Sequence, residues 1–94
     1  MIEIRWATLA TRDLEQIDSW YRDIDAGLGA KIVDGILVAT RLLREHPRAG
    51  AIELYGTRRK RRAAGTPYNL FYRVAGDHVR ILRVLHVARD QRPR

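Results

Sequence analysis

The sequence predicts an α+β domain in which a strand and an antiparallel pair of helices precede a three-stranded antiparallel sheet, in the order β-α-α-β-β-β. Apolar residues alternate with charged ones at the start of the chain, recur every three or four residues through its middle, and alternate again near its end. The 94 residues are enough for one hydrophobic core and too few for a second. We therefore expect a single domain spanning residues 1–94.

The first half of the chain carries one strand pattern and two helix patterns. Ile2, Ile4 and Trp6 alternate with charged residues, which predicts a short, half-buried strand. An apolar stripe at helical spacing then consists of Ala10, Leu14, Ile17, Tyr21 and Ile24. After a break at 25–29, a second stripe consists of Ala30, Val33, Ile36, Leu37, Thr40 and Leu43. Pro47 ends the second helix, and so short a break between the two predicts an antiparallel helical hairpin.

The second half predicts three strands. After a loop at 47–57, the basic run 58–62 is interpreted as a strand with cations on both faces. Residues 68–74 and 79–87 are clearer strands, and Ala75-Gly-Asp-His78 between them suits a tight hairpin. Centring that turn on Gly76 and Asp77 gives the pairs Val74–Val79, Tyr72–Ile81, Leu70–Arg83 and Tyr68–Leu85. This face is almost wholly apolar, so we expect it to pack under the helices.

The opposite face of the predicted hairpin is less apolar. It would carry Asn69, Phe71, Arg73, Arg80, Leu82, Val84 and His86. Two hypotheses remain open for its large apolar side chains, Phe71 and Leu82. They are either exposed as a contact surface for a partner or covered by another element of the chain.

Charge divides the chain into two unequal halves. Lys and Arg number 18 against 11 Asp and Glu, which gives a net charge of +7. Residues 1–57 hold 7 basic and 9 acidic side chains (−2), whereas residues 58–94 hold 11 basic and 2 acidic ones (+9). Sixteen of the cations are arginine, whose planar guanidinium suits bidentate contacts with phosphate or carboxylate. The second half predicts a polyanionic or acidic partner, although a GC-rich genome alone would also favour arginine.

Composition also excludes several kinds of site. Because there is no cysteine, the chain has no disulfide, thiol nucleophile, thiolate zinc site or iron–sulfur cluster. His46, His78 and His86 are too scattered for a metal motif, so we expect neither a metal nor a cofactor. No run of 18 apolar residues occurs and the N-terminus does not resemble a signal peptide, so we expect a cytoplasmic protein without a membrane partner.

Four stretches of sequence carry a resemblance to a known family. Two are the strand segments Tyr68-Asn-Leu-Phe-Tyr-Arg-Val74 and Ile81-Leu-Arg-Val-Leu-His-Val-Ala-Arg-Asp90. The others are Asp13-Leu-Glu-Gln-Ile17 in the first predicted helix and Glu45-His-Pro47 at the end of the second. In this order and spacing they resemble the ParE branch of the RelE/ParE toxin superfamily of bacterial type II toxin–antitoxin systems, over essentially the whole chain. The fold of that family agrees with the one predicted above.

The resemblance implies a growth-inhibiting toxin of a plasmid-stabilising, ParDE-like module whose partner is a ParD-like antitoxin. Such an antitoxin wraps an acidic C-terminal segment around its toxin in a hetero-oligomer, and operator DNA would be reached only through it. The predicted antitoxin contacts are Leu9, Trp20, Leu28, Leu42, Arg58, Arg59, Arg61 and Phe71. For Trp20, an ordinary core position is the alternative.

Two targets divide the superfamily, and the resemblance favours the first. A ParE-like toxin binds and poisons DNA gyrase without chemistry of its own. The expected target contacts are Arg83, Arg89, Arg92 and Arg94. A RelE-like toxin is instead a metal-independent endoribonuclease that cleaves mRNA in the ribosome. On that alternative the catalytic set would be Lys60, Arg62, Arg73, His86 and Arg89.

The nuclease set is incomplete in this sequence. Asn69 stands where the RelE pattern has an arginine, and the pattern's C-terminal tyrosine has no counterpart. His86 could act as a general acid or base near neutral pH, but a strand histidine hydrogen-bonded to the backbone is the simpler interpretation. A third hypothesis is a family member without toxicity, or a nucleic-acid-binding module whose basic half holds phosphates.

Overall fold

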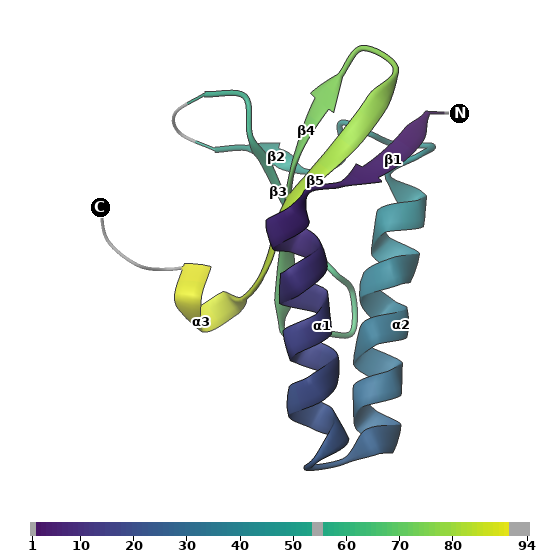
Figure 1. Cartoon of the computed structure of the whole chain (residues 1–94). Helices are drawn as coiled ribbons and strands as arrows, with labels where there is room; N and C mark the ends of the chain where they lie inside the picture. Colours follow the sequence, from purple (N-terminus) through teal and green to yellow (C-terminus); the bar gives the residue numbers. More distant parts are fainter. Residues whose placement is uncertain (1, 54–55, 91–94) are drawn as a thin grey trace.

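Two long helices form one layer of the fold and a β-sheet forms the other (Figure 1). The structure is a computed structural model that describes residues 2–53 and 56–90. Its helices are α1 (Thr8–Arg22), α2 (Ala26–Leu42) and α3 (Val87–Asp90). Its strands are β1 (Glu3–Trp6), β2 (Ala51–Ile52), β3 (Arg59–Arg62), β4 (Tyr68–Ala75) and β5 (His78–His86). The predicted α+β class and the order of the main elements are confirmed.

The helices α1 and α2 run antiparallel and side by side, as the sequence predicts (Figure 1). Asp25 fixes the turn between them, because its side chain accepts a hydrogen bond from the Leu28 N–H at 3.1 Å. Gly29 permits the close approach of the helices, since a Cβ at that position would lie 2.6 Å from the Cβ of Tyr21. The buried stripe of α1 is shorter than predicted, because Ile24 lies beyond the end of the helix and is 62% exposed.

The hydrophobic core lies between the helix pair and one face of the sheet. Its fully buried members include Tyr72, Ile36, Leu70, Ile81 and Val79. In α2, Ile32 is buried where the sequence pattern favours Ala30, which is exposed. In this turn of α2 the residue that contacts α1 is Gly29, and the buried stripe continues from it at helical spacing through Ile32.

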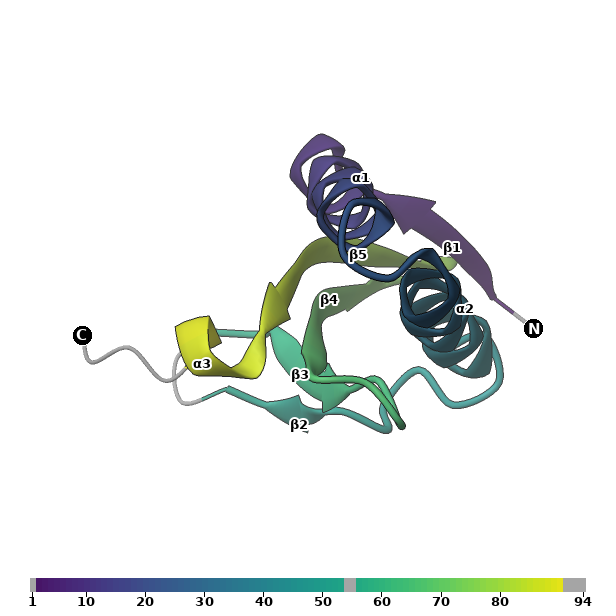
Figure 2. The same ribbon diagram turned by 90° about the horizontal axis from the view of Figure 1, so that it is seen from below.

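The sheet has five strands in the order β1-β5-β4-β3-β2, rather than the three predicted. β1 pairs in parallel with β5, so the N-terminal strand forms one edge of the same sheet. β2 pairs antiparallel with β3 and forms the other edge. It lies in a segment expected to be a loop, because a strand of two residues leaves no alternating pattern to detect. Figure 2 shows α2 and α3 on opposite sides of β4.

The hairpin of β4 and β5 contains one irregularity that shifts its register. The pairs Val74–Val79 and Tyr72–Ile81 are confirmed. Beyond them the predicted pairs Leu70–Arg83 and Tyr68–Leu85 are wrong, and the pairs Leu70–Val84 and Tyr68–His86 replace them. Leu82 is the extra residue of a β-bulge in β5. One extra residue reverses the face to which each later residue of the strand points.

The bulge overturns part of the predicted outer face, the face of the sheet directed away from α1 and α2. Val84 is 2% exposed and belongs to the core. His86 shares the helix face with its cross-strand partner Tyr68. Phe71 does lie on the outer face, but it is only 1% exposed, so the hypothesis of a covered ring is correct. The guanidinium carbon of Arg58 lies 4.7 Å from the centre of that ring.

Candidate functional site

A groove of about 270 Å³ lies between α2 and the edge of the sheet at β3. It is lined by Gly35, Val38, Ala39, Leu42, Leu43, His46, Ala49, Arg61, Arg62 and Ala64. β2 pairs only with Arg59 and Lys60, so in the described part of the chain the last two residues of β3 have no strand beside them at this edge. The groove therefore combines apolar side chains of α2 with two arginines of β3, which suits an acidic, amphipathic segment.

The basic run at 58–62 begins with an arginine that is paired with a carboxylate. Arg58 forms an ion pair with Glu53 across the connection of β2 and β3. The same guanidinium covers Phe71, so this pair also shields that ring on the outer face of the sheet. Phe71, predicted to contact an antitoxin, is therefore inside the fold, and the expectation that its ring is available on the surface is wrong.

The three arginines of β3 donate hydrogen bonds to backbone carbonyl groups. Arg59 donates to the Gly50 carbonyl at 2.7 Å, and Arg61 donates to the Ala49 carbonyl at 3.2 Å. Arg62 donates to a carbonyl of the turn after β3 at 2.6 Å. A carbonyl partner orders the side chain without neutralising it, so these contacts leave positive charge along the edge of the groove.

The four apolar side chains predicted to anchor an antitoxin are all exposed. Leu9 is 52% exposed, Trp20 64%, Leu28 44% and Leu42 55%. The alternative that Trp20 is an ordinary core residue is wrong. The four do not form one cluster, because only Leu42 among them borders the groove. Trp20 instead lies beside a second hollow on α1, together with Ile24.

A buried ion pair that the sequence analysis missed joins α1 to β5. Asp13 is 8% exposed, and its carboxylate accepts hydrogen bonds from Nε and Nη2 of Arg83 at 2.7 and 2.9 Å. The same carboxylate accepts from the Val84 N–H at 2.9 Å. β1 ends at Trp6, and the Ala7 N–H that follows it donates to the carbonyl of Ile81. The chain then enters α1, so β1 does not continue alongside Val84. Asp13 thus satisfies a backbone donor that β1 no longer reaches.

The sequence did contain a signal for this ion pair. Asp13 stands three residues after Ala10 and four before Ile17, so it lies on the apolar side of α1, where an unpaired carboxylate is costly. The hydrogen bonds from Arg83 to Asp13, together with the negative charge of Asp13, hold the pKa of the Arg83 guanidinium above its usual value. Arg83, expected to contact the target, therefore makes its strongest contacts inside the fold, and its side chain is 32% exposed.

His86 stands at the junction of β5 and α3 and is bonded to the backbone. Its Nδ1 accepts a hydrogen bond from the Ala88 N–H at 3.1 Å. The ring packs edge-on against Tyr68, with the ring centres 5.4 Å apart and the planes at 85°. Burial and a hydrogen bond with Tyr21 raise the pKa of Tyr68 to about 12. The simpler interpretation of His86, a histidine bonded to the backbone, is confirmed.

The structure does not bring the five residues of the nuclease alternative together. Lys60 and Arg62 lie on the outer face of the sheet, whereas His86 lies on the helix face. Arg73 lies near the turn of the β4–β5 hairpin, roughly 17 Å of extended strand away from the partner of His86. His86 and Arg89 do meet, because both border a hollow of about 140 Å³ between α1 and β5.

Two of the predicted target contacts, Arg92 and Arg94, lie outside the described residues. Among the residues that are described, no three histidine, aspartate or glutamate side chains are grouped as metal ligands would be. Within the same ranges, none of the helices has both the length and the apolar character needed to cross a bilayer.

Comparison with known proteins gives matches of sequence over nearly the whole chain. The family model described as ParE toxin of type II toxin-antitoxin system, parDE, matches residues 4–91. A curated relative, "Putative toxin Y4kP" of Sinorhizobium fredii (strain NBRC 101917 / NGR234), is 34% identical over 83 residues. The match covers 88% of this chain and 85% of the relative.

Solved structures share the fold. The structure described as "Chromosomal ParDE TA system from P. aeruginosa" superposes with a TM-score of 0.80 at 24% identity, covering 92% of this chain and 96% of that one. The "YoeB/ParE toxin from Agrobacterium tumefaciens" gives a TM-score of 0.64 at 20% identity, covering 90% and 98%. Because the family model and the curated relative both match most of the sequence, the chain belongs to the ParE family of toxins of type II toxin–antitoxin systems, and an antitoxin is its partner.

Proposed function

We propose that the chain inhibits growth by binding and poisoning DNA gyrase, without chemistry of its own, until a ParD-like antitoxin neutralises it. The dispersal of the nuclease set carries the non-enzymatic part of this proposal. Lys60 and Arg62 lie on one face of the sheet, and His86 lies on the other and is engaged with the backbone. Within this described set, His86 therefore does not stand beside Lys60 and Arg62, whereas RNA cleavage requires a general acid or base next to grouped cations. The match to the ParE family model supports gyrase as the target, since that target is typical of the ParE branch.

The antitoxin would be held in the groove between α2 and β3. An acidic, amphipathic segment would bury apolar side chains against Val38 and Leu42, which are 38% and 55% exposed in the free chain. Its carboxylates would meet Arg61 and Arg62 at the border of the groove. The carbonyl bonds that order these arginines reduce the entropy lost on binding, because the side chains are already held in place.

We assign the gyrase contact to α3 and the arginines that follow it. Arg89 lies on α3, and Arg92 and Arg94 come next in the sequence. Arg83 would act indirectly on this surface. Its two hydrogen bonds to Asp13 fix the part of β5 from which α3 continues.

The test is an assay of purified gyrase with increasing amounts of this chain, free of antitoxin. We expect loss of DNA supercoiling and accumulation of cleaved DNA, and both should be reversed by antitoxin. Arg89→Gln should weaken the inhibition, whereas Arg12→Gln, which removes an exposed arginine from α1, should not. If a chain that still binds antitoxin leaves both gyrase reactions unchanged, the proposed target is wrong.

The nuclease alternative has one observation in its favour, the shared hollow of His86 and Arg89. Incubation of the chain with ribosomes that hold mRNA in the A site tests it directly. We expect no cleavage of the mRNA, and cleavage that disappears in the His86→Ala variant would support the alternative.

A further inference from the structure

Three arginines form a row across the outer face of the sheet. In the register of the strands, Arg5 of β1 lies opposite Arg80 of β5, and Arg80 lies opposite Arg73 of β4. All three side chains are exposed. The residues next to them pair in the same way and pack toward the helices; they are Ile4, Val79 and Val74. Since neighbouring residues of a strand point to opposite faces, Arg5, Arg80 and Arg73 share the outer face, and we call them the arginine row.

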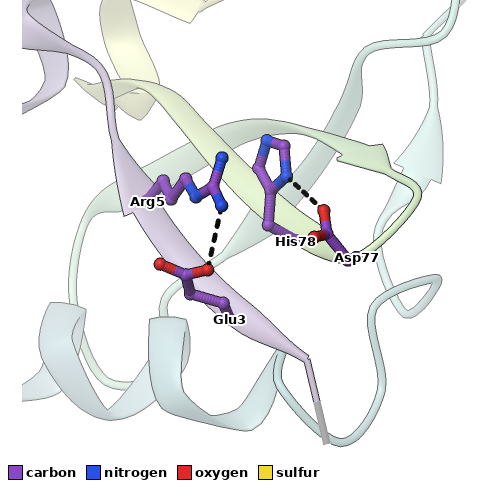
Figure 3. A network of polar contacts seen from close by, with 4 residues as sticks. All are labelled: Glu3, Arg5, Asp77 and His78. Atoms are coloured by element: carbon purple, nitrogen blue, oxygen red, sulfur yellow. Dashed lines mark hydrogen bonds and ion pairs between the residues drawn. The ribbon is translucent and has the colours of Figure 1, made fainter.

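The arginine row opposes the stability of the sheet. Neighbouring strands are about 4.8 Å apart, and like charges that face one another across them repel. Within the described residues, an acidic partner reaches one end of the row, where Arg5 lies 3.1 Å from Glu3 (Figure 3). The nearby carboxylate of Asp77 is engaged by His78 at 3.0 Å. The other two members of the row form no ion pair with any residue that the structure describes.

The surroundings of the row favour a polyanion over a peptide. A peptide partner usually needs exposed apolar anchors, and the large ones described here lie on the helix pair, in the turn between its helices and on β2; they are Leu9, Trp20, Ile24, Leu28, Val38, Leu42 and Ile52. Single-stranded nucleic acid usually needs aromatic side chains on which its bases stack. Phe71, on the same face as the row, is buried under Arg58 and offers no such surface.

We propose that the arginine row binds the phosphate backbone of duplex DNA without reading its sequence. The row spans roughly 10 Å across three strands, and duplex DNA carries one negative charge per about 1.7 Å of its axis, so each arginine can reach a phosphate. Guanidinium groups form bidentate hydrogen bonds with phosphate, and their binding releases condensed counterions. The choice of DNA over duplex RNA rests on the proposed function, because gyrase acts on duplex DNA. The proposal departs from the expectation that DNA is reached only through the antitoxin.

The test measures binding of the free chain to a short, fluorescently labelled DNA duplex by anisotropy, at several salt concentrations and without gyrase. The row variant is Arg73→Gln/Arg80→Gln. Its matched control, Arg12→Gln/Arg41→Gln, removes the same charge from exposed positions of α1 and α2. We expect the row variant to bind roughly tenfold more weakly, with the slope of log K against log salt smaller by about two, one for each lost phosphate contact. The control should change far less.

Several outcomes would overturn this proposal. Equal losses in both variants would mean that only net charge matters, and an unchanged affinity would mean that the row does not bind DNA. Tighter binding of single-stranded DNA or of an RNA duplex would exclude duplex DNA as the ligand. Polyglutamate and unlabelled DNA are also compared, at equal charge, as competitors of the labelled duplex. If polyglutamate displaces the duplex as effectively as DNA does, the row binds an acidic protein partner instead.

Folding of the row variant is checked by thermal unfolding, and we expect it to be at least as stable as the parent chain, because repulsion has been removed. If the double variant does not fold, Arg73→Gln is compared with Arg12→Gln, with a slope change of about one. The proposal can fail separately from the proposed function, since the assay contains no gyrase. If the parent chain binds DNA through the row but does not inhibit gyrase, the proposed target is wrong. If it inhibits gyrase but does not bind DNA through the row, the DNA-binding proposal is wrong.

Discussion

At the scale of single residues, Asp13 holds together two parts of the chain that are distant in sequence. Asp13→Ala leaves the guanidinium of Arg83 and the N–H of Val84 without their acceptor. Removing one member of a largely buried ion pair is expected to lower the free energy of unfolding by about 3 kcal/mol, less whatever water can recover at the exposed part of Arg83. Urea unfolding monitored by circular dichroism measures this change.

The control for Asp13 is an acidic residue on the same helix with an exposed arginine partner. Asp18 pairs with Arg22 at 2.5 Å, and the side chains are 50% and 66% exposed. Exposed pairs of this kind contribute little, so Asp18→Ala should change the free energy of unfolding by no more than about 0.5 kcal/mol. Equal effects of the two substitutions would contradict the structural role assigned to Asp13.

His86 has a side chain that could act as a general acid or base, but its ring is hydrogen-bonded to the backbone. Because its Nδ1 accepts from the Ala88 N–H, its contribution is to the start of α3. We expect His86→Ala to retain growth inhibition in cells and His86→Asn, whose Oδ1 can accept the same hydrogen bond, to retain it fully. If both variants fold and both lose toxicity, the result would point to a catalytic imidazole.

Tyr68 predicts how stability changes at alkaline pH. Its pKa is raised to about 12 in the folded chain by burial and by the hydrogen bond with Tyr21, whereas an unfolded tyrosine has a pKa near 10. Between these values the unfolded state binds fewer protons, so stability falls as the pH rises from about 10 to about 12, by up to about 3 kcal/mol. Below pH 10 the contribution is fully present.

Chemical denaturation at a series of pH values tests the role of Tyr68. Tyr68→Phe should remove most of the alkaline loss. Tyr21→Phe keeps the burial of Tyr68, which is the larger cause of its shift, and should retain most of that loss. An alkaline profile that is the same in Tyr68→Phe and in the parent chain would assign the loss to other groups.

At the scale of elements, β3 is the strand expected to recognise the antitoxin by charge. We expect Arg59→Glu/Arg61→Glu to weaken antitoxin binding at least roughly tenfold with little change in thermal stability. Calorimetric titration with the antitoxin measures the affinity. Arg59→Gln/Arg61→Gln keeps donors for the carbonyls of Ala49 and Gly50, so an intermediate loss in that variant separates charge from loop order. Affinity equal to that of Arg12→Glu/Arg41→Glu would place the acidic segment elsewhere.

The elements that the sequence predicts well are those with a long local pattern. The stripe through Ala10 and Ile17 and the alternation through Tyr68–Val74 extend over enough residues to identify a helix and a strand. The ends of β4 and β5 nearest the turn pair as predicted, because the turn sequence fixes register there. The bulge at Leu82 could not be predicted in the same way, since no short-range rule requires an extra residue at that point.

The bulge and the buried ion pair explain each other once the structure is known. With the extra residue, the N–H of Val84 points away from β4 and toward α1, where Asp13 accepts it. This agreement depends on residues about 70 positions apart, which no local pattern reports. The same bulge places His86 on the helix face, opposite Tyr68 and away from Lys60 and Arg62.

At the scale of the whole molecule, the proposed binding surfaces lie on different sides of the sheet. The groove that would hold the antitoxin lies beside α2, whereas the arginine row lies on the outer face across β1, β5 and β4. An antitoxin in the groove would therefore leave the row accessible unless it also wraps around the sheet. Binding of DNA to the row and of antitoxin to the groove can then be measured in the same complex.

The uneven charge of the chain predicts how the antitoxin finds it. The +9 of residues 58–94 should attract an acidic segment over distances set by ionic screening, whose length falls from about 10 Å at 0.1 M salt to about 3 Å at 1 M. We expect the association rate to fall roughly tenfold or more over this range. The dissociation rate should change much less, because the apolar contacts of Val38 and Leu42 are not screened by salt. Stopped-flow fluorescence of an antitoxin labelled next to its acidic segment measures both rates, and an association rate independent of salt would show that charge does not guide the encounter.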